Sequence, residues 1–588
     1  MQEELNKLKG DHKIPFRVLV KKTMHYVKPE WLSFVLALLL IGANVGLDLY
    51  LPRLVMDITD ELLKDSFEYS MILNWSILYI SISFASMVFI YFESMLLQRA
   101  GQRIIYKLRI DIFEHIQNMS QNQFNEMPVG SLVTRVANYT QSMSDLFTNV
   151  LVNIVKNAVY VVAVYIYMYQ ISWQLSLIML GPVTIVAISS FIFSRVVHKI
   201  FRNERAHISD MNTYLNENLS GMKITQIFNQ QEYKEEEFNK KNKDLFKARF
   251  GVTVCFGIYR PFITLVYMTS VAICFYFGFQ FGLAGGAVVA FYMYLSKFFN
   301  PVQQLADQLN NLQKALTASE RLFNLMDVLP EVKDLPDAID IDHFNGKIEF
   351  RNVWFAYVGD DWILKDVSFV IEPKQTVAFV GATGAGKTTI LGLIVRNFEI
   401  QKGQILIDDI DITKIKIKSL RKAIGQMLQD VFLFSGTIKE NITLHDDAYS
   451  NEEVMEVCKY VNADSFIEKL PEKLEYQVLE SGENFSQGQR QLLSFARTVL
   501  ANPQILILDE ATANIDTETE VLIQESLEKI KNIGTMLVVA HRLSTIQHSD
   551  QIMVLQKGEI IERGNHQELL AKHGHYYKLY KLQYENKE

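Results

Sequence analysis

Residues Gly381-Ala382-Thr383-Gly384-Ala385-Gly386-Lys387-Thr388 match the pattern G-x-x-x-x-G-K-[ST] in full. They follow a short β-rich run, Thr376–Val380, and lead into a predicted helix that begins at Lys387. Because glycines let the backbone curl, the N–H groups of such a loop face bound phosphate groups, and the helix N-terminus adds partial positive charge. The sequence therefore predicts a phosphate-binding loop between a strand and a helix.

The polar residues at the end of this loop have separate expected roles. Lys387 should reach the β- and γ-phosphates of ATP, and the Thr388 hydroxyl should bind Mg²⁺. We include the neighbouring Thr389 in the nucleotide site.

Two further strands are predicted to bring hydrolytic residues to the nucleotide. The buried strand Ile505–Leu508 ends in Asp509-Glu510. Asp509 is expected to hold Mg²⁺, directly or through water, and Glu510 to accept a proton from the attacking water. The strand Thr535–Ala540 leads to His541, which we expect beside the γ-phosphate.

Composition places these motifs in a chain with more than one domain. Its 588 residues exceed what one core usually holds. Hydrophobic residues form 49% of the chain and are concentrated in the first 300 positions, whereas the net charge of −8 argues against nucleic acid as the main partner. Three cysteines have no metal-ligand spacing and are interpreted as small unpaired hydrophobic residues: Cys255, Cys274 and Cys458.

The N-terminal half contains six apolar stretches, each long enough or nearly long enough to cross a bilayer, which takes about 20 residues. Tight turns are expected at Gln170-Ile171-Ser172, between the third and fourth, and at Phe281-Gly282-Leu283, between the fifth and sixth. The first thirty residues are polar, so we predict no cleavable signal peptide and an internal anchor from Trp31. The predicted spans are Trp31–Met56, Met71–Leu97, Leu151–Gln170, Trp173–Ser194, Val252–Gln280 and Ala284–Phe299.

The distribution of charge predicts the orientation in the cell membrane. Lysine and arginine are frequent before Trp31, whereas the loop 57–70 carries only Lys64 among several carboxylates. By the positive-inside rule the N-terminus is cytoplasmic, and six crossings place the C-terminus there as well.

Two long polar loops should therefore lie in the cytoplasm, Gln98–Leu146 and Arg195–Gly251. They are rich in helix-forming residues, so the membrane helices are expected to continue into the cytoplasm. A tip of each loop is predicted to contact the soluble domain, at Pro128–Leu132 and at Ser220–Ile224, although both could be ordinary turns.

Ionisable residues inside spans are costly and raise a functional hypothesis. Lys156, Arg260 and Lys297 are expected near mid-depth, with Asp48 nearer the outside. They could line a polar cavity that contacts substrate; the alternative is snorkelling or pairing within the helix bundle.

The predicted fold class is an all-α polytopic membrane domain followed by an α/β ATPase domain of the phosphate-loop type. We expect a cytoplasmic N-terminal segment at 1–30, six membrane helices within 31–325, a linker at 326–345 and the nucleotide-binding domain at 346–588. Strands are predicted at Lys347–Val353, Ser368–Ile371, Thr376–Val380, Gln404–Ile407, Ile505–Leu508, Thr535–Ala540 and Gln551–Gln556.

Together these features resemble ATP-binding cassette (ABC) transporters, specifically bacterial half-transporter exporters, over nearly the whole chain. The resemblance implies that Tyr357 stacks on adenine and that Gln429 binds Mg²⁺ and the attacking water. It implies that Ser486, Gly488 and Gln489 form the signature motif, which contacts ATP held by the opposite cassette.

The resemblance also assigns Glu510 as catalytic base and His541 as switch histidine. Asp516 matches the loop aspartate that crosses the interface between two cassettes.

Two departures from the family pattern favour a heterodimer. The signature Leu-Ser-Gly-Gly-Gln is here Phe485-Ser486-Gln487-Gly488-Gln489, with a large Gln487 where backbone must approach a phosphate. The usual Ser-Ala-Leu-Asp is here Ala513-Asn514-Ile515-Asp516. We expect this chain to pair an intact Glu510 with a partner half-transporter's good signature; a homodimer is the less favoured alternative.

The sequence says least about which compound is transported. Lipophilic or amphipathic compounds suit the aromatic and aliphatic spans, and a lipid flippase shares every cassette motif. Import is disfavoured because importers usually keep membrane and cassette parts on separate chains. A nucleotide-gated channel or sensor is opposed by Glu510 and His541, and a soluble DNA-repair ATPase is opposed by the six apolar stretches.

Overall fold

The computed structural model describes residues 13–64, 68–427, 431–509, 517–539 and 546–584. Two compact units are present. The first contains the described parts of 1–117 and 127–328, and the second contains 118–126 and the described parts of 329–588. The chain therefore leaves the first unit briefly at 118–126 before returning to it.

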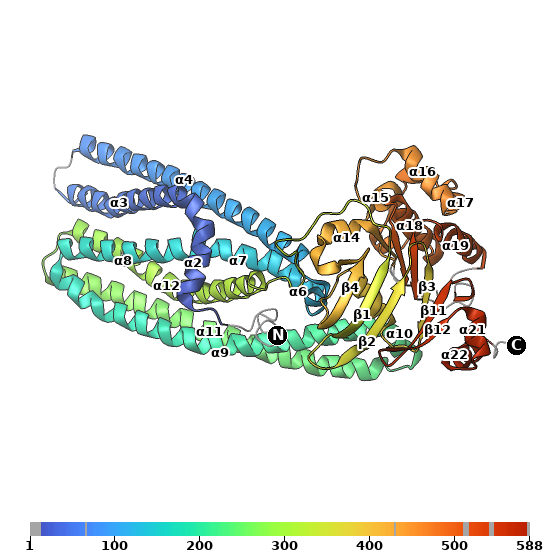
Figure 1. Cartoon of the computed structure of the whole chain (residues 1–588). Coiled ribbons are helices and arrows are strands. Elements are labelled where there is room, and N and C mark those ends of the chain that lie inside the picture. The colour runs from blue at the N-terminus through green and yellow to red at the C-terminus, as the bar shows by residue number, and fades with distance from the viewer. Residues whose placement is uncertain (1–12, 65–67, 428–430, 510–516, 540–545, 585–588) are drawn as a thin grey trace. The chain divides into compact units, whose positions relative to one another are not determined.

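The first unit is built from long helices that lie side by side (Figure 1). The bounds are α2 (Phe16–Val27), the 3₁₀ turn η1 (Lys28–Glu30), α3 (Trp31–Leu62), α4 (Tyr69–Gln117), α6 (Val129–Thr134), the π-helical η2 (Arg135–Tyr139), α7 (Thr140–Asp145), the π-helical η3 (Leu146–Leu151), α8 (Val152–Ile171), α9 (Trp173–Ser220), α10 (Met222–Ile227), α11 (Gln231–Gln280) and α12 (Gly285–Met326).

Several helices extend well beyond their apolar parts, as predicted. The apolar span Trp173–Ser194 is the first half of α9, which has 48 residues, and α11 has 50. The turn between α8 and α9 is as short as expected, because Ser172 alone separates them and its hydroxyl accepts a hydrogen bond from the N–H of Leu175 at 3.4 Å. Gly221 likewise separates α9 from α10, inside the predicted tip Ser220–Ile224.

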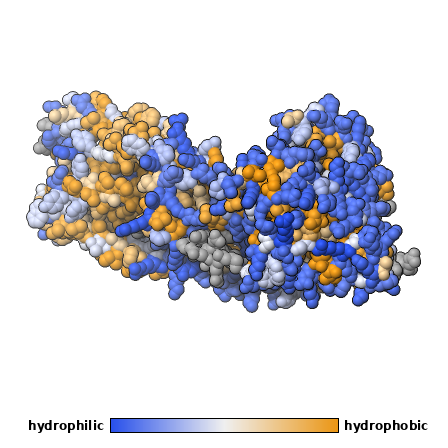
Figure 2. All heavy atoms as spheres, in the orientation of Figure 1, coloured by the Kyte–Doolittle hydropathy of each residue, from blue (hydrophilic) through white to orange (hydrophobic). Residues whose placement is uncertain are grey.

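The surfaces of these helices carry many exposed apolar side chains. Leu39, Ile80 and Phe84 are each about two-thirds exposed, which is unfavourable in water and suits lipid contact. Figure 2 shows hydrophobic residues gathered over the long helices. Within the described residues, five helical stretches are long and apolar enough to cross a membrane: Phe16–Leu62, Tyr69–Gln117, Val129–Ile171, Trp173–Ser220 and Gln231–Gln280.

The sixth predicted span lies in α12, which is not among those five stretches. Its apolar part is interrupted by Lys297 and Asn300, which lower its hydropathy. Within the unit, α12 packs against α3, α8 and α9, and Phe291, Tyr294 and Leu295 are fully buried there. Burial among other helices explains why α12 needs less apolar surface than its neighbours.

The second unit is an α/β fold with two main sheets. The larger has the strand order β12-β11-β3-β10-β9-β6, and β11, β3, β10, β9 and β6 run parallel. The smaller, β2-β1-β4-β5, is antiparallel. The strands are β1 (Ile348–Ala356), β2 (Trp362–Ile371), β3 (Thr376–Gly381), β4 (Lys402–Ile407), β5 (Ile410–Asp411), β6 (Ile424–Met427), β7 (Gly436–Thr437), β8 (Gln477–Val478), β9 (Ile505–Asp509), β10 (Thr535–Val539), β11 (Gln551–Gln556) and β12 (Glu559–Gly564).

Helices pack around these sheets over two apolar cores. Strands β3, β9 and β10 are buried on both faces, as expected of parallel strands, which is why their sequences are continuous apolar runs. The helices are α5 (Gln121–Asn125), α13 (Lys387–Ile394), η4 (Ile412–Lys414), α14 (Ile417–Ala423), α15 (Ile438–Thr443), α16 (Asn451–Tyr460), α17 (Asp464–Ile467), η5 (Lys473–Glu475), η6 (Glu480–Gly482), α18 (Gln487–Leu500), α19 (Thr517–Ile530), α21 (His566–Ala571) and α22 (His575–Tyr584).

The segment 118–126 joins the second unit through the chain just after Val328. Gln123, at 2% exposure, donates from Nε2 to the carbonyl oxygen of Leu329 at 2.8 Å, and Ser120 Oγ donates to Glu331 at 3.2 Å. The part of the first inner loop that belongs to the second unit is therefore the segment around α5, which precedes the predicted tip at 128–132.

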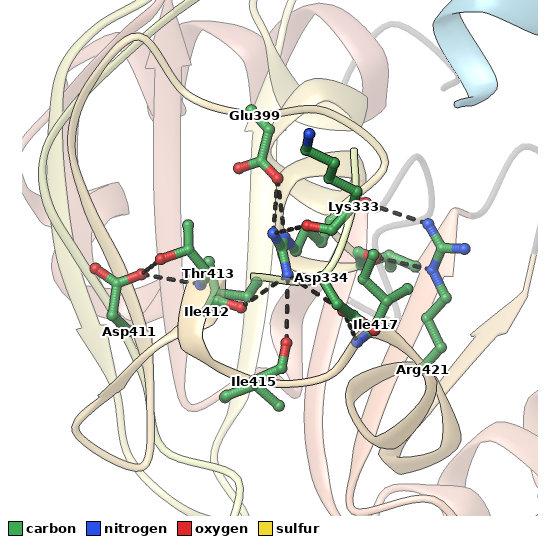
Figure 3. A network of polar contacts seen from close by, with 11 residues as sticks. Lys333, Asp334, Glu399, Asp411, Ile412, Thr413, Ile415, Ile417 and Arg421 are labelled. Carbon is green, nitrogen blue, oxygen red and sulfur yellow. Dashed lines mark hydrogen bonds and ion pairs between the residues drawn. The ribbon is translucent and has the colours of Figure 1, made fainter. Parts of the chain in front are cut away.

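Arg396 fixes the following part of the connecting chain, and Figure 3 labels its partners Lys333, Ile415 and Glu399. This side chain is 2% exposed and lies just after α13. It donates to the carbonyl oxygen of Lys333 at 3.0 Å and of Ile415 at 3.2 Å, and it pairs with Glu399 at 2.9 Å. The guanidinium thus ties the segment that enters this unit to the end of the helix that follows the phosphate loop.

Candidate nucleotide site

The phosphate loop connects β3 to α13, the context that the sequence predicted. Gly386 caps α13 with φ of 103°, a left-handed conformation that favours glycine. A Cβ added there would lie 2.7 Å from Leu364 Cδ2, and one added at Gly381 would collide with the carbonyl oxygen of Leu555. Sterics therefore require glycine at both ends of the loop.

Lys387 lies inside the curve of this loop. Its Nζ donates to the carbonyl oxygens of Gly381 at 2.8 Å and Ala382 at 3.1 Å, and the residue is 8% exposed. Burial lowers the pKa of Lys387, an effect that the nearby Asp509 partly opposes. A buried ammonium held by neutral carbonyls suits an anionic ligand, because a phosphate would compensate its charge.

The next residues connect the loop to an aromatic side chain. Thr388 is exposed at the start of α13, whereas Thr389 is buried, with its hydroxyl 3.0 Å from Tyr357 Oη. The ring of Tyr357 is 40% exposed and packs edge-on against Phe355 and Phe398, at centroid distances of 4.9 and 5.2 Å. Tyr357 is therefore anchored beside the phosphate loop with part of its ring free to contact a base.

The parallel sheet brings the acidic motif to the same edge. Asp509 ends β9 in register with Val539 at the end of β10, and β10 lies between β9 and β3. Ligands of open α/β sheets bind at the carboxyl ends of such strands. Gln429, Glu510, Asp516 and His541 lie outside the described residues.

The signature residues form the start of α18. The side chain of Ser486 accepts from the N–H of Gln489, and Gln489 Oε1 accepts from the N–H of Ser486. Gly488 is buried, and Gln487 is the first helical residue and half-buried. Gln487 thus stands at the N-terminus of a helix, where an anion would approach.

Of the four ionisable residues singled out in the predicted spans, Asp48, Lys156 and Lys297 form ion pairs within the helix bundle. Lys297 Nζ lies 2.6 Å from Asp48, which also accepts from the hydroxyl of Tyr160. Lys156 pairs with Glu93 at 3.1 Å. Both lysines follow the predicted alternative of pairing within the bundle.

The remaining cation of that group, Arg260, lies over the ring of Phe256 at 5.5 Å. Sequence reasoning missed the two partners of this set, Glu93 and Tyr160. Glu93 was detectable as a lone carboxylate within the apolar run Met71–Leu97.

Comparison with known proteins identifies the family. Residues 31–302 match the ABC transporter transmembrane region, and residues 364–513 match the ABC transporter family. A probable multidrug resistance ABC transporter ATP-binding/permease protein of Bacillus subtilis, YheH, is 38% identical over 85% of this chain and 75% of its own. The chain belongs to the ABC transporter family.

Two further similarities describe the kind of transporter. An ATP-dependent lipid A-core flippase of Syntrophus aciditrophicus is 34% identical over 84% of this chain and 83% of its own. The structure of a bacterial Atm1-family ABC exporter with ATP bound superposes with a TM-score of 0.78 and 26% identity, covering 94% of this chain and 98% of that one.

These findings confirm the predicted architecture and the general activity. The chain is a half-transporter, with a membrane domain and an ATP-binding domain in one polypeptide. It binds ATP and couples ATP hydrolysis to export across a membrane. ABC exporters act as dimers, so the complete transporter contains two such halves.

Proposed function

We propose that this half-transporter exports lipophilic or amphipathic compounds across the cytoplasmic membrane and pairs with a different half-transporter. The observation that carries the pairing is the side chain of Gln487 at the N-terminus of α18, in a chain whose own phosphate loop is intact. The signature motif of such a chain makes a poor contact with the ATP held by its partner, while the chain keeps its own hydrolytic residues.

Each residue of the nucleotide site has a proposed role. The backbone N–H groups of 381–386 and the ammonium of Lys387 hold the phosphates, and Tyr357 stacks on adenine. Glu510 takes the proton of the attacking water, and His541 contacts the γ-phosphate.

The oxygen donors of this nucleotide site also suit a magnesium ion. Thr388, Asp509 and Gln429 would hold the ion, which neutralises charge on the β- and γ-phosphates when bound. Hydroxyl, carboxylate and amide oxygens are the donors that such a hard cation prefers.

Two ATP molecules are bound between two cassettes, each held by one chain's phosphate loop and the other chain's signature. Here Ser486, Gly488, Gln489 and Asp516 face the partner's ATP, and the inner loops carry the closure of the cassettes to the membrane helices. A bound nucleotide shifts the equilibrium between the inward-facing and outward-facing conformations only by the difference in its affinity for the two. Hydrolysis at the Glu510 site reopens the dimer.

The cargo class is supported by the exposed apolar surface of the membrane helices and by the multidrug resistance name of YheH. Lipid translocation is the second candidate, because the flippase relative shares the same architecture. The N- and C-termini are cytoplasmic in both cases.

Transport in vesicles tests the proposal. Inverted membrane vesicles that contain this chain and the product of the neighbouring gene should accumulate lipophilic dyes when ATP is added. Vesicles with Glu510→Gln provide the control for leakage. Translocation of labelled phospholipid without dye uptake would favour the flippase, and accumulation of neither would contradict the proposed cargo.

A further inference from the structure

The first unit contains a cavity of about 730 Å³ that lies outside the apolar parts of its helices. Its walls come from α9 at 197–205, from α12 at 311–321 and from Tyr139 and Ser142. His198 lies four residues after the predicted span of α9 ends at Ser194, a rise of about 6 Å. The cavity therefore begins close to the edge of the predicted span.

The basic side chains of this cavity share one face on each helix. On α9, His198, Arg202 and Arg205 recur at intervals of four and three residues. On α12, Lys314 and Arg321 are seven residues apart. Both spacings place side chains on the same side of a helix, so the two basic faces border a common space.

The lining is strongly unbalanced in charge. Among the described side chains that line it, five are basic and none is a carboxylate. Within the described part of the chain, the ion pairs found do not involve Arg202, Arg205 or Lys314. Arg321 donates to the neutral hydroxyl of Tyr139 at 2.9 Å.

The positive-inside rule does not by itself explain this arrangement. It accounts for basic residues near the cytoplasmic ends of spans, but not for their convergence from two helices into one space. Arg195 and Lys199 belong to the same basic stretch of α9 and lie outside the lining. Gathering like charges in a concave site costs free energy, which a bound anion would offset.

We propose that this cavity binds the carboxylate or phosphate of an amphipathic anion. The inference rests on the proposed export function and narrows its cargo to molecules with an acidic group. Guanidinium groups of Arg202 and Arg205 suit the bidentate geometry of such anions. Val197, Phe201 and Ala318 supply an apolar wall for the attached body.

Equilibrium binding in neutral detergent, without nucleotide, tests this site on the assembled transporter. The probes are a fluorescent dodecanoate, the same fluorophore on dodecyltrimethylammonium, and inorganic phosphate as competitor. Arg202→Gln with Lys314→Gln should weaken dodecanoate binding by about tenfold or more, since each lost charge-assisted hydrogen bond contributes substantially to the binding free energy. Dodecyltrimethylammonium binding should not weaken.

Two matched variants show whether a loss of dodecanoate binding comes from the charges of the cavity, from a lower overall charge or from misfolding. Lys199→Gln with Lys223→Gln removes the same charge from exposed positions outside the cavity and should leave dodecanoate binding within about twofold. Arg202→Lys with Lys314→Arg keeps the charge and should retain most of the binding.

The competitor distinguishes the source of the anion. Displacement of dodecanoate by inorganic phosphate supports a site for soluble anions, whereas no displacement supports a membrane-derived amphiphile. Equal dodecanoate affinity in the wild type and in the Arg202→Gln/Lys314→Gln variant would overturn the proposal. Because no nucleotide is present, failure of transport would not by itself abolish this binding.

Discussion

The side chain of Ser486 accepts a hydrogen bond from the backbone N–H of Gln489 at 3.2 Å, and the Gln489 amide oxygen accepts one from the N–H of Ser486 at 3.0 Å. This capping box sets the start of α18 and fixes the position of Gln487, the first residue of the helix. A glutamine side chain occupies space at a helix N-terminus that is otherwise suited to a phosphate.

Replacing Gln487 with glycine should improve the contact between the signature motif and the ATP held by the opposite cassette. We expect Gln487→Gly to raise the ATPase rate of the chain purified alone several-fold, because the backbone can then approach the phosphate of the opposite ATP. Gln567→Gly, at an exposed position near the start of α21, provides a control for the loss of helix stability. No increase over wild type would show that Gln487 is not what limits the homodimer.

Removing the proposed base should stop turnover without stopping ATP binding. Glu510→Gln should lower the ATPase rate of the assembled transporter by a factor of about 10² to 10⁴, the usual contribution of a general base. ATP should still bring the cassettes together, which cross-linking or a spectroscopic distance measurement can detect. Glu528→Gln, on the exposed side of α19, should have little effect, and rapid turnover by Glu510→Gln would identify another residue as the base.

The buried ammonium of Lys387 predicts opposite effects on stability with and without nucleotide. Burial lowers its pKa below the ordinary 10.5, so below both pKa values the folded state carries a constant cost, which is relieved only as pH rises through the folded-state pKa. At pH 7, Lys387→Met should therefore raise the unfolding midpoint of the nucleotide-free protein and abolish its increase on adding ATP. Lys418→Met, an exposed position, should leave both midpoints unchanged. A Lys387→Met protein that ATP still stabilises would contradict this role.

Arg396 should be important for stability rather than for chemistry. Arg396→Met leaves the buried carbonyl oxygen of Ile415 and the part-buried carbonyl oxygen of Lys333 without this donor, at about 1–3 kcal/mol for an unsatisfied buried group. The unfolding midpoint should fall by about 5 °C or more. Arg351→Met, which removes a half-exposed ion pair with Glu349, should shift it by less than about 2 °C. Equal shifts in the two variants would refute the anchoring role.

Sequence patterns predicted the order of elements well where the physical constraint was local. The loop at 381–388 needs glycine for steric reasons, and the buried parallel strands β3, β9 and β10 need continuous apolar runs, so both were visible. Five strands were missed: β5, β7 and β8 have two residues each and β6 has four, too few for a periodic pattern, and β12 has no buried residue to mark a core-facing side.

Contacts between distant segments could not be predicted. The partners of Lys156 and Lys297 depend on how α3, α4, α8 and α12 pack, which a single sequence does not encode as a pattern. The same holds for Gln123, whose contact with Leu329 joins segments 206 positions apart.

The most direct test of unequal nucleotide sites is a single-turnover measurement on the fully assembled transporter loaded with two labelled ATP molecules. We predict fast hydrolysis of one ATP per complex, at the site that contains Glu510 and the partner's signature, and slow turnover of the other. Equally fast hydrolysis of both ATP molecules would contradict the proposed asymmetric pairing.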